Sequence, residues 1–171
     1  MRIYLIGYMA SGKSFLGSLL AEKLGFEFID LDYLFEERYR INVADFFEKY
    51  DEGIFRKIER SLLHETAGFD DVVVSTGGGT PCFFDNMEFI KQSGISIYLC
   101  QTVPELVSRR KGVKRKRPLL RDIPLAELEA KVASQLAERA FFYNQADMVI
   151  SGEDSDPDKL LQLLRSRMKS N

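Results

Sequence analysis

The segment from Gly7 to Ser14 has the sequence GYMASGKS, which fits the pattern G-x-x-x-x-G-K-[ST]. It follows the apolar run Ile3–Ile6 and leads into a segment with leucines at helical spacing. In this strand-to-helix setting, backbone N–H groups and the helix N-terminus point at phosphate oxygens. We expect Lys13 to reach the β- and γ-phosphates and the Ser14 hydroxyl to bind Mg²⁺. The pattern therefore predicts nucleoside triphosphate binding rather than a glycine-rich turn that only packs a helix on a strand.

Short apolar runs rich in β-branched residues alternate with segments of helical periodicity along the 171 residues. This alternation is typical of a single α/β domain with a parallel sheet flanked by helices. Gly25 is expected to end the first helix, and Thr102 with Glu105 forms a capping box before another. Asp85 and Glu88 form a D-x-x-E pattern that predicts a further helix start. The predicted strands are Ile3–Ile6, Glu27–Asp30, Val72–Ser75, Ile95–Leu99 and Met148–Ser151.

Two segments depart from plain alternation of strands and helices. The stretch at about 31–68, between the second and third predicted strands, is helical throughout and too long for a simple crossover. The stretch at about 109–122 is basic and irregular. In a protein that transfers phosphate, one insertion would hold the acceptor and the other would close over the donor as a mobile lid.

Composition limits the classes of function. The formal net charge is −2 and the pI is about 5.6, which gives no general attraction to nucleic acid or to an anionic membrane. The longest apolar runs are strand-sized, and Met1 leads almost directly into the first strand, so neither a spanning helix nor a signal peptide is expected. Cys82 and Cys100 lack metal or redox spacing, and His64 is interpreted as a helix-surface residue. A cytoplasmic location is therefore expected.

Asp30 and Asp32 lie in the sequence FIDLD at the end of the second predicted strand. Ligands of open α/β sheets bind beyond the carboxyl ends of the strands, where this pair would lie. One carboxylate could bind Mg²⁺ through water, and the other could orient an attacking hydroxyl. The alternative is that Asp32 is the N-cap of a helix that starts at Tyr33. The pair alone does not separate these interpretations.

Three further features suggest a small anionic acceptor. The glycines Gly77–Gly79 follow the third predicted strand, where backbone can approach a ligand closely; a loose surface turn is the alternative. Arg56 lies three residues before Glu59 on one helical face, and Arg139 lies on an apolar helical stripe. Either arginine could simply form a surface salt bridge. If both face an acceptor, that acceptor should carry a carboxylate, because guanidinium binds this group through two parallel hydrogen bonds.

The most basic stretch runs from Arg109 to Arg121 and, considered alone, resembles a nucleic-acid patch. It contains no aromatic residue on which bases could stack, and the protein is acidic overall. A lid that brings one arginine to the β- and γ-phosphates explains the stretch better.

Together these motifs resemble those of the shikimate kinase family, and the resemblance spans nearly the whole chain. It implies a three-layer P-loop kinase fold of the nucleoside-monophosphate-kinase type, with a five-stranded parallel sheet in the order 2-3-1-4-5. It also implies transfer of the γ-phosphate of ATP to the 3-hydroxyl of shikimate, a step toward chorismate and the aromatic amino acids. The motifs are, in order, Gly7–Ser14, F-x-D-x-D at Phe28–Asp32, F-R-x-x-E at Phe55–Glu59, Gly77–Gly79, R-P-L-L at Arg117–Leu120, and E-R followed by Tyr at Glu138, Arg139 and Tyr143.

The resemblance implies catalytic roles for Lys13, Asp32 and Arg117. Lys13 would contact the transferring phosphate, Asp32 would hydrogen-bond the attacking hydroxyl, and Arg117 would close with the lid. Mg²⁺ would be bound by Ser14 and Asp30. ATP would contact Ala10, Ser11, Gly12, Lys13, Ser14, Phe15, Arg110 and Arg117, with Asp156 and Pro157 near the adenine.

The resemblance also implies how the acceptor is bound. Arg56 and Arg139 would bind the shikimate carboxylate, and the backbone at Gly78 and Gly79 would meet substrate and γ-phosphate. Asp32 would complete this set, and Phe47 and Phe55 would wall the ring. Two departures stand out: Phe15 replaces a frequent Ser or Thr, and Arg139–Tyr143 lacks a proline that the family often has there.

Two other classes remain open at this point. One is a P-loop kinase for another small hydroxylated acceptor, such as gluconate or a nucleotide. The other is a non-catalytic nucleotide switch, although Asn144–Asp147 resembles the guanine-reading motif only superficially. The expected partners are ATP and shikimate, without nucleic acid or membrane, and the protein is expected to be a monomer.

Overall fold

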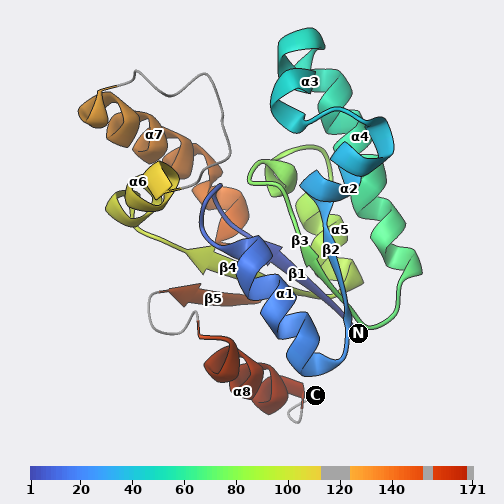
Figure 1. Ribbon diagram of the computed structural model, residues 1–171. Helices are drawn as coiled ribbons and strands as arrows, with labels where there is room; N and C mark the ends of the chain where they lie inside the picture. Colours follow the sequence, from blue (N-terminus) through green and yellow to red (C-terminus); the bar gives the residue numbers. More distant parts are fainter. Residues whose placement is uncertain (113–123, 152–155, 169–171) are drawn as a thin grey trace.

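The strands form one parallel sheet whose order is β2-β3-β1-β4-β5. The computed structural model describes residues 1–112, 124–151 and 156–168. Within these ranges the elements alternate as expected for βα units, with three helices inserted between β2 and β3 (Figure 1). The strands are β1 (Arg2–Ile6), β2 (Glu27–Asp30), β3 (Val72–Ser75), β4 (Ile95–Cys100) and β5 (Met148–Ser151). The helices are α1 (Lys13–Leu24), α2 (Leu31–Tyr39), α3 (Val43–Lys49), α4 (Glu52–Glu65), α5 (Asn86–Ser93), α6 (Val103–Gly112), α7 (Leu125–Tyr143) and α8 (Pro157–Met168), with 3₁₀ turns η1 (Thr66–Gly68) and η2 (Thr80–Cys82).

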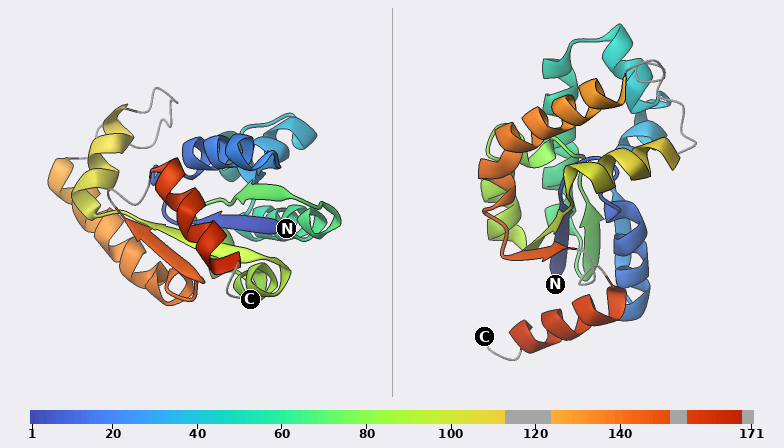
Figure 2. Two further views of the ribbon diagram at one scale, coloured as in Figure 1. Left: turned by 90° about the horizontal axis from the view of Figure 1, so that it is seen from below. Right: turned by 90° about the vertical axis from the view of Figure 1, so that its left-hand side faces the viewer.

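The alternation of side chains along the strands produces three layers. Tyr4 and Ile6 of β1 point into a core shared with α4, α5 and α7, while Ile3 and Leu5 point into a second core shared with α1 and α8. Because both faces of a parallel sheet are covered, its central strands are apolar at almost every position. Figure 2 shows α1 on one side of the sheet and α5 and α7 on the other. α8 packs against α1. The predicted fold class and strand order are therefore confirmed.

Local end signals explain most helix boundaries. Gly25 is left-handed at φ 70° and ends α1 as predicted. The capping box also forms, because the Thr102 backbone N–H donates to the Glu105 carboxylate at 2.7 Å and the Glu105 N–H donates to Thr102 Oγ1 at 3.4 Å. Two predicted strands were one residue too short: β1 begins at Arg2 rather than Ile3, and β4 ends at Cys100 rather than Leu99.

Competing partners decide the side-chain capping at two helix starts. The helix after β2 begins at Leu31, and Asp30 caps it by accepting the N–H groups of Asp32 and Tyr33; Asp32 is therefore not the N-cap. The helix start predicted from Asp85 and Glu88 is confirmed, because α5 begins at Asn86. Asp85 makes no side-chain cap bond there, because the Arg60 guanidinium binds both of its oxygens, at 2.6 and 2.9 Å. An arginine fork offers a carboxylate two parallel bonds, which compete with a single N–H at a helix start.

His64 was interpreted as a surface residue of a helix, and the structure places it on α4 but half-buried. Its ring stacks on Phe89 with 4.0 Å between the ring centroids. Burial, together with the nearby Arg60 charge, lowers the pKa of His64 from its ordinary value. The ring therefore packs as a neutral aromatic group.

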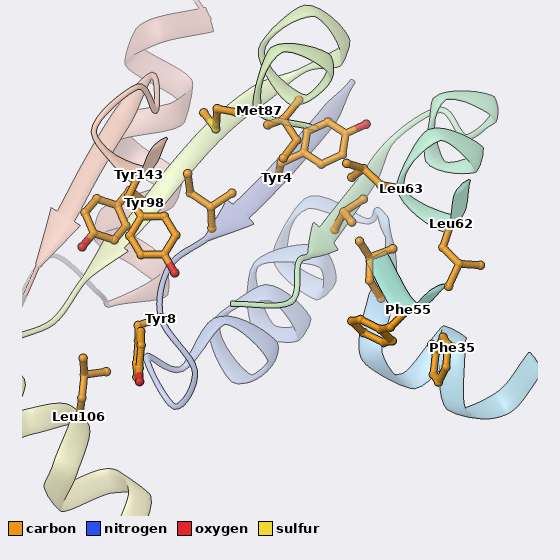
Figure 3. Close-up of a cluster of buried hydrophobic side chains, with 14 of the residues drawn as sticks. Tyr4, Tyr8, Phe35, Phe55, Leu62, Leu63, Met87, Tyr98, Leu106 and Tyr143 are labelled. Atoms are coloured by element: carbon orange, nitrogen blue, oxygen red, sulfur yellow. The ribbon is translucent and has the colours of Figure 1, made fainter. Parts of the chain in front are cut away.

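The insertion between β2 and β3 lies at the end of the sheet where these strands finish. Figure 1 shows α2, α3 and the start of α4 together at this end. Its interior is aromatic: Phe35 contacts Phe46 and Phe55, each at a centroid separation of 5.1 Å. This cluster is continuous with the core between the sheet and α4, α5 and α7 (Figure 3). In the part of the chain that the structure describes, no helix is long and apolar enough to cross a membrane.

We expect Leu20→Ala to destabilise the protein by about 3 kcal/mol, because it leaves a cavity between α1 and the sheet. Leu163→Ala is the matched control, since Leu163 is 45% exposed on α8; its effect should be at most about 0.5 kcal/mol. Urea unfolding measures both. Equal effects of the two substitutions would contradict the assigned core.

Candidate functional site

The loop between β1 and α1 has the backbone conformation of an anion-binding turn. Ala10 and Gly12 are left-handed, at φ 65° and 98°, and Gly7 has φ 144°. A Cβ atom at Gly7 would also lie 2.8 Å from the carbonyl oxygen of Leu99, so the loop runs against the end of β4. A turn of this kind presents successive N–H groups on one concave side, next to the N-terminus of α1.

Lys13 lies across this loop. Its ammonium donates to the carbonyl oxygens of Gly7 at 2.8 Å and Tyr8 at 2.9 Å, and the side chain is almost fully buried. The charge is thus held beside the N–H groups that would bind phosphate. That Lys13 reaches the β- and γ-phosphates stays a prediction.

Asp30 joins the phosphate loop to the insertion. One of its oxygens caps α2, and the other accepts the hydroxyl of Ser14 at 2.5 Å. The Ser75 hydroxyl lies 3.4 Å from that of Ser14. The structure therefore places side by side the two residues that are expected to bind Mg²⁺.

This oxygen set fits a hard cation that retains water. Mg²⁺ prefers oxygen ligands and is usually bound by one or two protein groups together with phosphate oxygens and water. Among the described residues, no group of three or more His, Cys, Asp or Glu side chains could hold a metal ion. Ser14 and Asp30 would supply oxygen ligands for Mg²⁺, and phosphate oxygens and water would complete the set.

The glycine loop after β3 is where the site's side chains approach the backbone most closely. A Cβ atom at Gly77 would lie 2.7 Å from Glu59 Oε1 and 3.2 Å from Asp32 Oδ1. A Cβ atom at Gly79 would lie 2.7 Å from both terminal nitrogens of Arg56. These positions lack side chains because two carboxylates and a guanidinium occupy the space, and the interpretation as a loose surface turn is wrong.

Arg56 is held by carboxylates and aromatic rings. Its Nη1 donates to Glu59 at 2.8 Å, and its Nε and Nη2 donate to Glu52 at 3.1 and 2.9 Å. The guanidinium carbon lies 4.1 Å from the ring centroid of Phe83. The other oxygen of Glu59 accepts the Thr80 hydroxyl at 2.5 Å, which connects α4 to the glycine loop. The sequence placed Arg56 and Glu59 on one helical face, and the structure joins them in a buried ion pair rather than a surface salt bridge.

Arg139 reaches the same loop from α7. Its Nη1 donates to the carbonyl oxygen of Gly78 at 3.3 Å, and its guanidinium carbon lies 5.3 Å from the ring centroid of Tyr8. The hydroxyl of Tyr143 donates to the same carbonyl at 2.5 Å. Burial raises the pKa of Tyr143 far above its ordinary value, so the phenol stays protonated and acts as a donor.

The structure thus brings most of the predicted residues to one edge of the sheet. Phe15 points to solvent with 72% exposure, so only its backbone lies at the loop. Phe47 packs on Phe55 with 4.6 Å between centroids, next to Arg56. Arg110 belongs to α6, but its side chain lies outside the described part, as does Arg117 entirely.

Sequence reasoning missed two contacts of the phosphate loop. Arg109 donates to the Ser11 carbonyl oxygen at 2.9 Å, although Arg110 was the arginine that the resemblance singled out. The Tyr8 hydroxyl donates to Gln135 Oε1 at 2.5 Å. The basic composition of this stretch indicated that an arginine would lie near the phosphate loop, but it did not indicate which arginine. Nothing in the local pattern indicated that Tyr8 would meet α7.

The comparisons with known proteins agree with this geometry. The family described as shikimate kinase matches residues 9–169. The chain belongs to the shikimate kinase family. A shikimate kinase of Parabacteroides distasonis is 47% identical over 152 residues, which cover 89% of this chain and 88% of that protein.

Solved shikimate kinases share the fold closely. The crystal structure of the shikimate kinase from Bacteroides thetaiotaomicron has a TM-score of 0.91 and 40% identity, covering 96% of this chain and 98% of that one. The Acinetobacter baumannii shikimate kinase in complex with shikimate has a TM-score of 0.86 and 36% identity, covering 97% and 93%. Fold and family membership therefore agree over nearly the full length.

We expect Glu59→Gln to reduce the free energy of unfolding by about 3 kcal/mol, because it removes one partner from a buried ion pair. The control is Glu65→Gln, which breaks the exposed pair with Arg38 and should cost at most about 1 kcal/mol. Denaturant unfolding of both variants tests this. A loss no larger for Glu59 than for Glu65 would show that Arg56 does not depend on the pair.

Proposed function

We propose that this shikimate kinase transfers the γ-phosphate of ATP to the 3-hydroxyl of shikimate at the edge of the sheet where β1, β2 and β3 end. The observation that carries the proposal is the meeting of two groups of residues at Gly78. Its Cβ position lies 3.0 Å from the backbone nitrogen of Met9 in the phosphate loop, and its carbonyl oxygen accepts Arg139. Donor and acceptor sites are therefore adjacent.

The donor side consists of the β1–α1 loop and the N-terminus of α1. Backbone N–H groups along Ala10–Phe15 bind the phosphates, and Lys13 neutralises charge that develops on the transferring group. From the family resemblance, Arg110 and the Asp156–Pro157 segment flank the adenine, and Arg117 binds the phosphates. ATP contacts in this proposal are Ala10, Ser11, Gly12, Lys13, Ser14, Phe15, Arg110 and Arg117.

Ser14 and Asp30 hold Mg²⁺ in this proposal, Asp30 directly or through water. The ion would neutralise charge on the phosphates. Asp30 contributes a second effect, because the same carboxylate caps α2 and so orients the following residues. Among them is Asp32.

The acceptor side consists of Asp32, the glycine loop and the two arginines. Arg56 and Arg139 bind the shikimate carboxylate, and the backbone at Gly78 and Gly79 contacts the substrate. Asp32 accepts the hydrogen bond of the 3-hydroxyl. The hydroxyl oxygen then bonds to the γ-phosphorus while the bond from that phosphorus to the β,γ-bridging oxygen breaks. The hydroxyl proton leaves toward Asp32, and ADP departs.

We further propose that residues 1–171 act as one domain and one monomeric, cytoplasmic enzyme. The insertion at about 31–68 supports acceptor binding because it supplies Asp32 and Arg56, with Phe47 and Phe55 as the wall of the pocket. The stretch at about 109–122 is assigned as the lid from the family resemblance and lies largely outside the described residues.

We expect Lys13→Ala to lower kcat by about a hundredfold or more, because a charge aimed at the transferring phosphate is lost. The assay follows ADP release with and without shikimate. Lys23→Ala, in the last turn of the same helix, should leave kcat unchanged. ADP release that does not depend on shikimate would favour a nucleotide switch, and release only with gluconate would favour another acceptor.

We expect Arg139→Ala to raise the KM for shikimate by about tenfold or more, because a charged hydrogen bond to the carboxylate is lost. The KM for ATP should change much less. Arg165→Ala on α8 is the control, since Arg165 is exposed and distant in sequence from the site. An unchanged KM for shikimate in the Arg139 variant would remove Arg139 from the acceptor site.

A further inference from the structure

Tyr8 contacts both the phosphate lysine and the acceptor arginine. It follows Gly7 in the phosphate loop, and its side chain is 1% exposed. Its carbonyl oxygen accepts the ammonium of Lys13 at 2.9 Å and the N–H of Ser11 at 3.2 Å. The backbone of Tyr8 is therefore part of the donor site.

The side chain of Tyr8 points to α7. Its hydroxyl donates to Gln135 at 2.5 Å, and the guanidinium carbon of Arg139 lies 5.3 Å from its ring centroid. Gln135 and Arg139 are four residues apart and so lie on one face of the helix. Figure 3 shows the Tyr8 ring beside the loop, with Leu106 of α6 nearby in the same buried cluster. One tyrosine thus meets α7 at two successive turns.

The two acceptor arginines are held in different ways. Arg56 is paired with Glu52 and Glu59, which neutralise its charge. The contacts described for Arg139 are with neutral groups, namely the Gly78 carbonyl, the Tyr143 hydroxyl and the Tyr8 ring. The face of an aromatic ring attracts a cation without cancelling its charge. Arg139 is therefore oriented while its charge stays available to an anion.

We propose that Tyr8 is a positioning residue that orients Arg139 through its ring and fixes the phosphate loop through its hydroxyl bond to Gln135. The inference rests on the proposed function, in which Arg139 binds the acceptor carboxylate. It adds that one side chain of the donor loop sets the geometry of the acceptor site.

The test separates the ring from the hydroxyl. Tyr8→Leu removes the ring face, and we expect it to raise the KM for shikimate by about fivefold, within the range of a desolvated cation–π contact. Tyr8→Phe keeps the ring, so the KM for shikimate should stay within about twofold of that of the unmodified enzyme. It should raise the KM for ATP by about threefold, as Gln135→Leu should, because either change removes the same hydrogen bond.

Combined variants distinguish positioning from a general structural effect. In Tyr8→Leu with Arg139→Ala, the KM for shikimate should equal that of Arg139→Ala alone, because Tyr8 acts through Arg139. In the double variant Tyr8→Phe/Gln135→Leu, the KM for ATP should equal that of either single variant, because both substitutions remove the same hydrogen bond. Fully additive effects in either pair would overturn the inference. Phe141→Leu is the control on α7, since Phe141 is exposed.

The outcomes for the inference and for the proposed function can be told apart. If Arg139→Ala raises the KM for shikimate and Tyr8→Leu does not, the positioning role of Tyr8 is wrong and the proposed acceptor site stands. If neither changes it, the acceptor assignment itself is wrong, and the inference falls with it. Thermal unfolding identifies a variant that has lost its fold. If Tyr8→Leu does not fold, Tyr8→Phe and Gln135→Leu decide, and an unchanged KM for ATP in both overturns the proposal.

Discussion

The close approach of two backbone loops at Gly78 is the constraint on which the site depends. A side chain at this position would meet the Met9 nitrogen and the Arg139 guanidinium. The Gly78 carbonyl in turn accepts bonds from two residues of α7. Because these contacts join the ends of β1 and β3 to a distant helix, the phosphate loop and the acceptor residues share one rigid edge of the sheet (Figure 1).

The charged side chains on this edge of the sheet each have specific partners that orient them. Asp30 divides its two oxygens between a helix cap and the Ser14 hydroxyl, which leaves it fixed but still able to hold a cation with water. Arg56 is neutralised by carboxylates, whereas Arg139 is held by neutral groups. Burial raises the pKa of the half-buried Cys82 thiol to about 11, so this neighbour of both arginines stays uncharged at neutral pH. Among the described residues, the contacts given for Arg139 are with neutral groups, so an arriving carboxylate would find an oriented positive charge there.

Much of the fold and the site could be predicted because the signals are local. The phosphate loop needs its glycines and lysine at set spacing, strands need short apolar runs, and helix ends need particular residues, as at Gly25 and Thr102. The alternative that Asp32 caps a helix was wrong, whereas the helix start predicted at Asp85 was right but lacks a side-chain cap bond; a competing residue decided each case. Asp30, two residues before Asp32, caps α2, and Arg60 of α4 binds the Asp85 carboxylate.

By itself the sequence determined the fold class, the phosphate loop, the placement of Arg56 and Glu59 on one helical face, and, by resemblance, the family. Only the tertiary structure decided that Arg109 bonds the Ser11 carbonyl and that Tyr8 meets Gln135 and Arg139. These partners are about a hundred residues apart or more, so no spacing along the chain encodes their contact. They meet because the parallel sheet places β1 next to β4 and the helices after β4 pack beside the loop that follows β1.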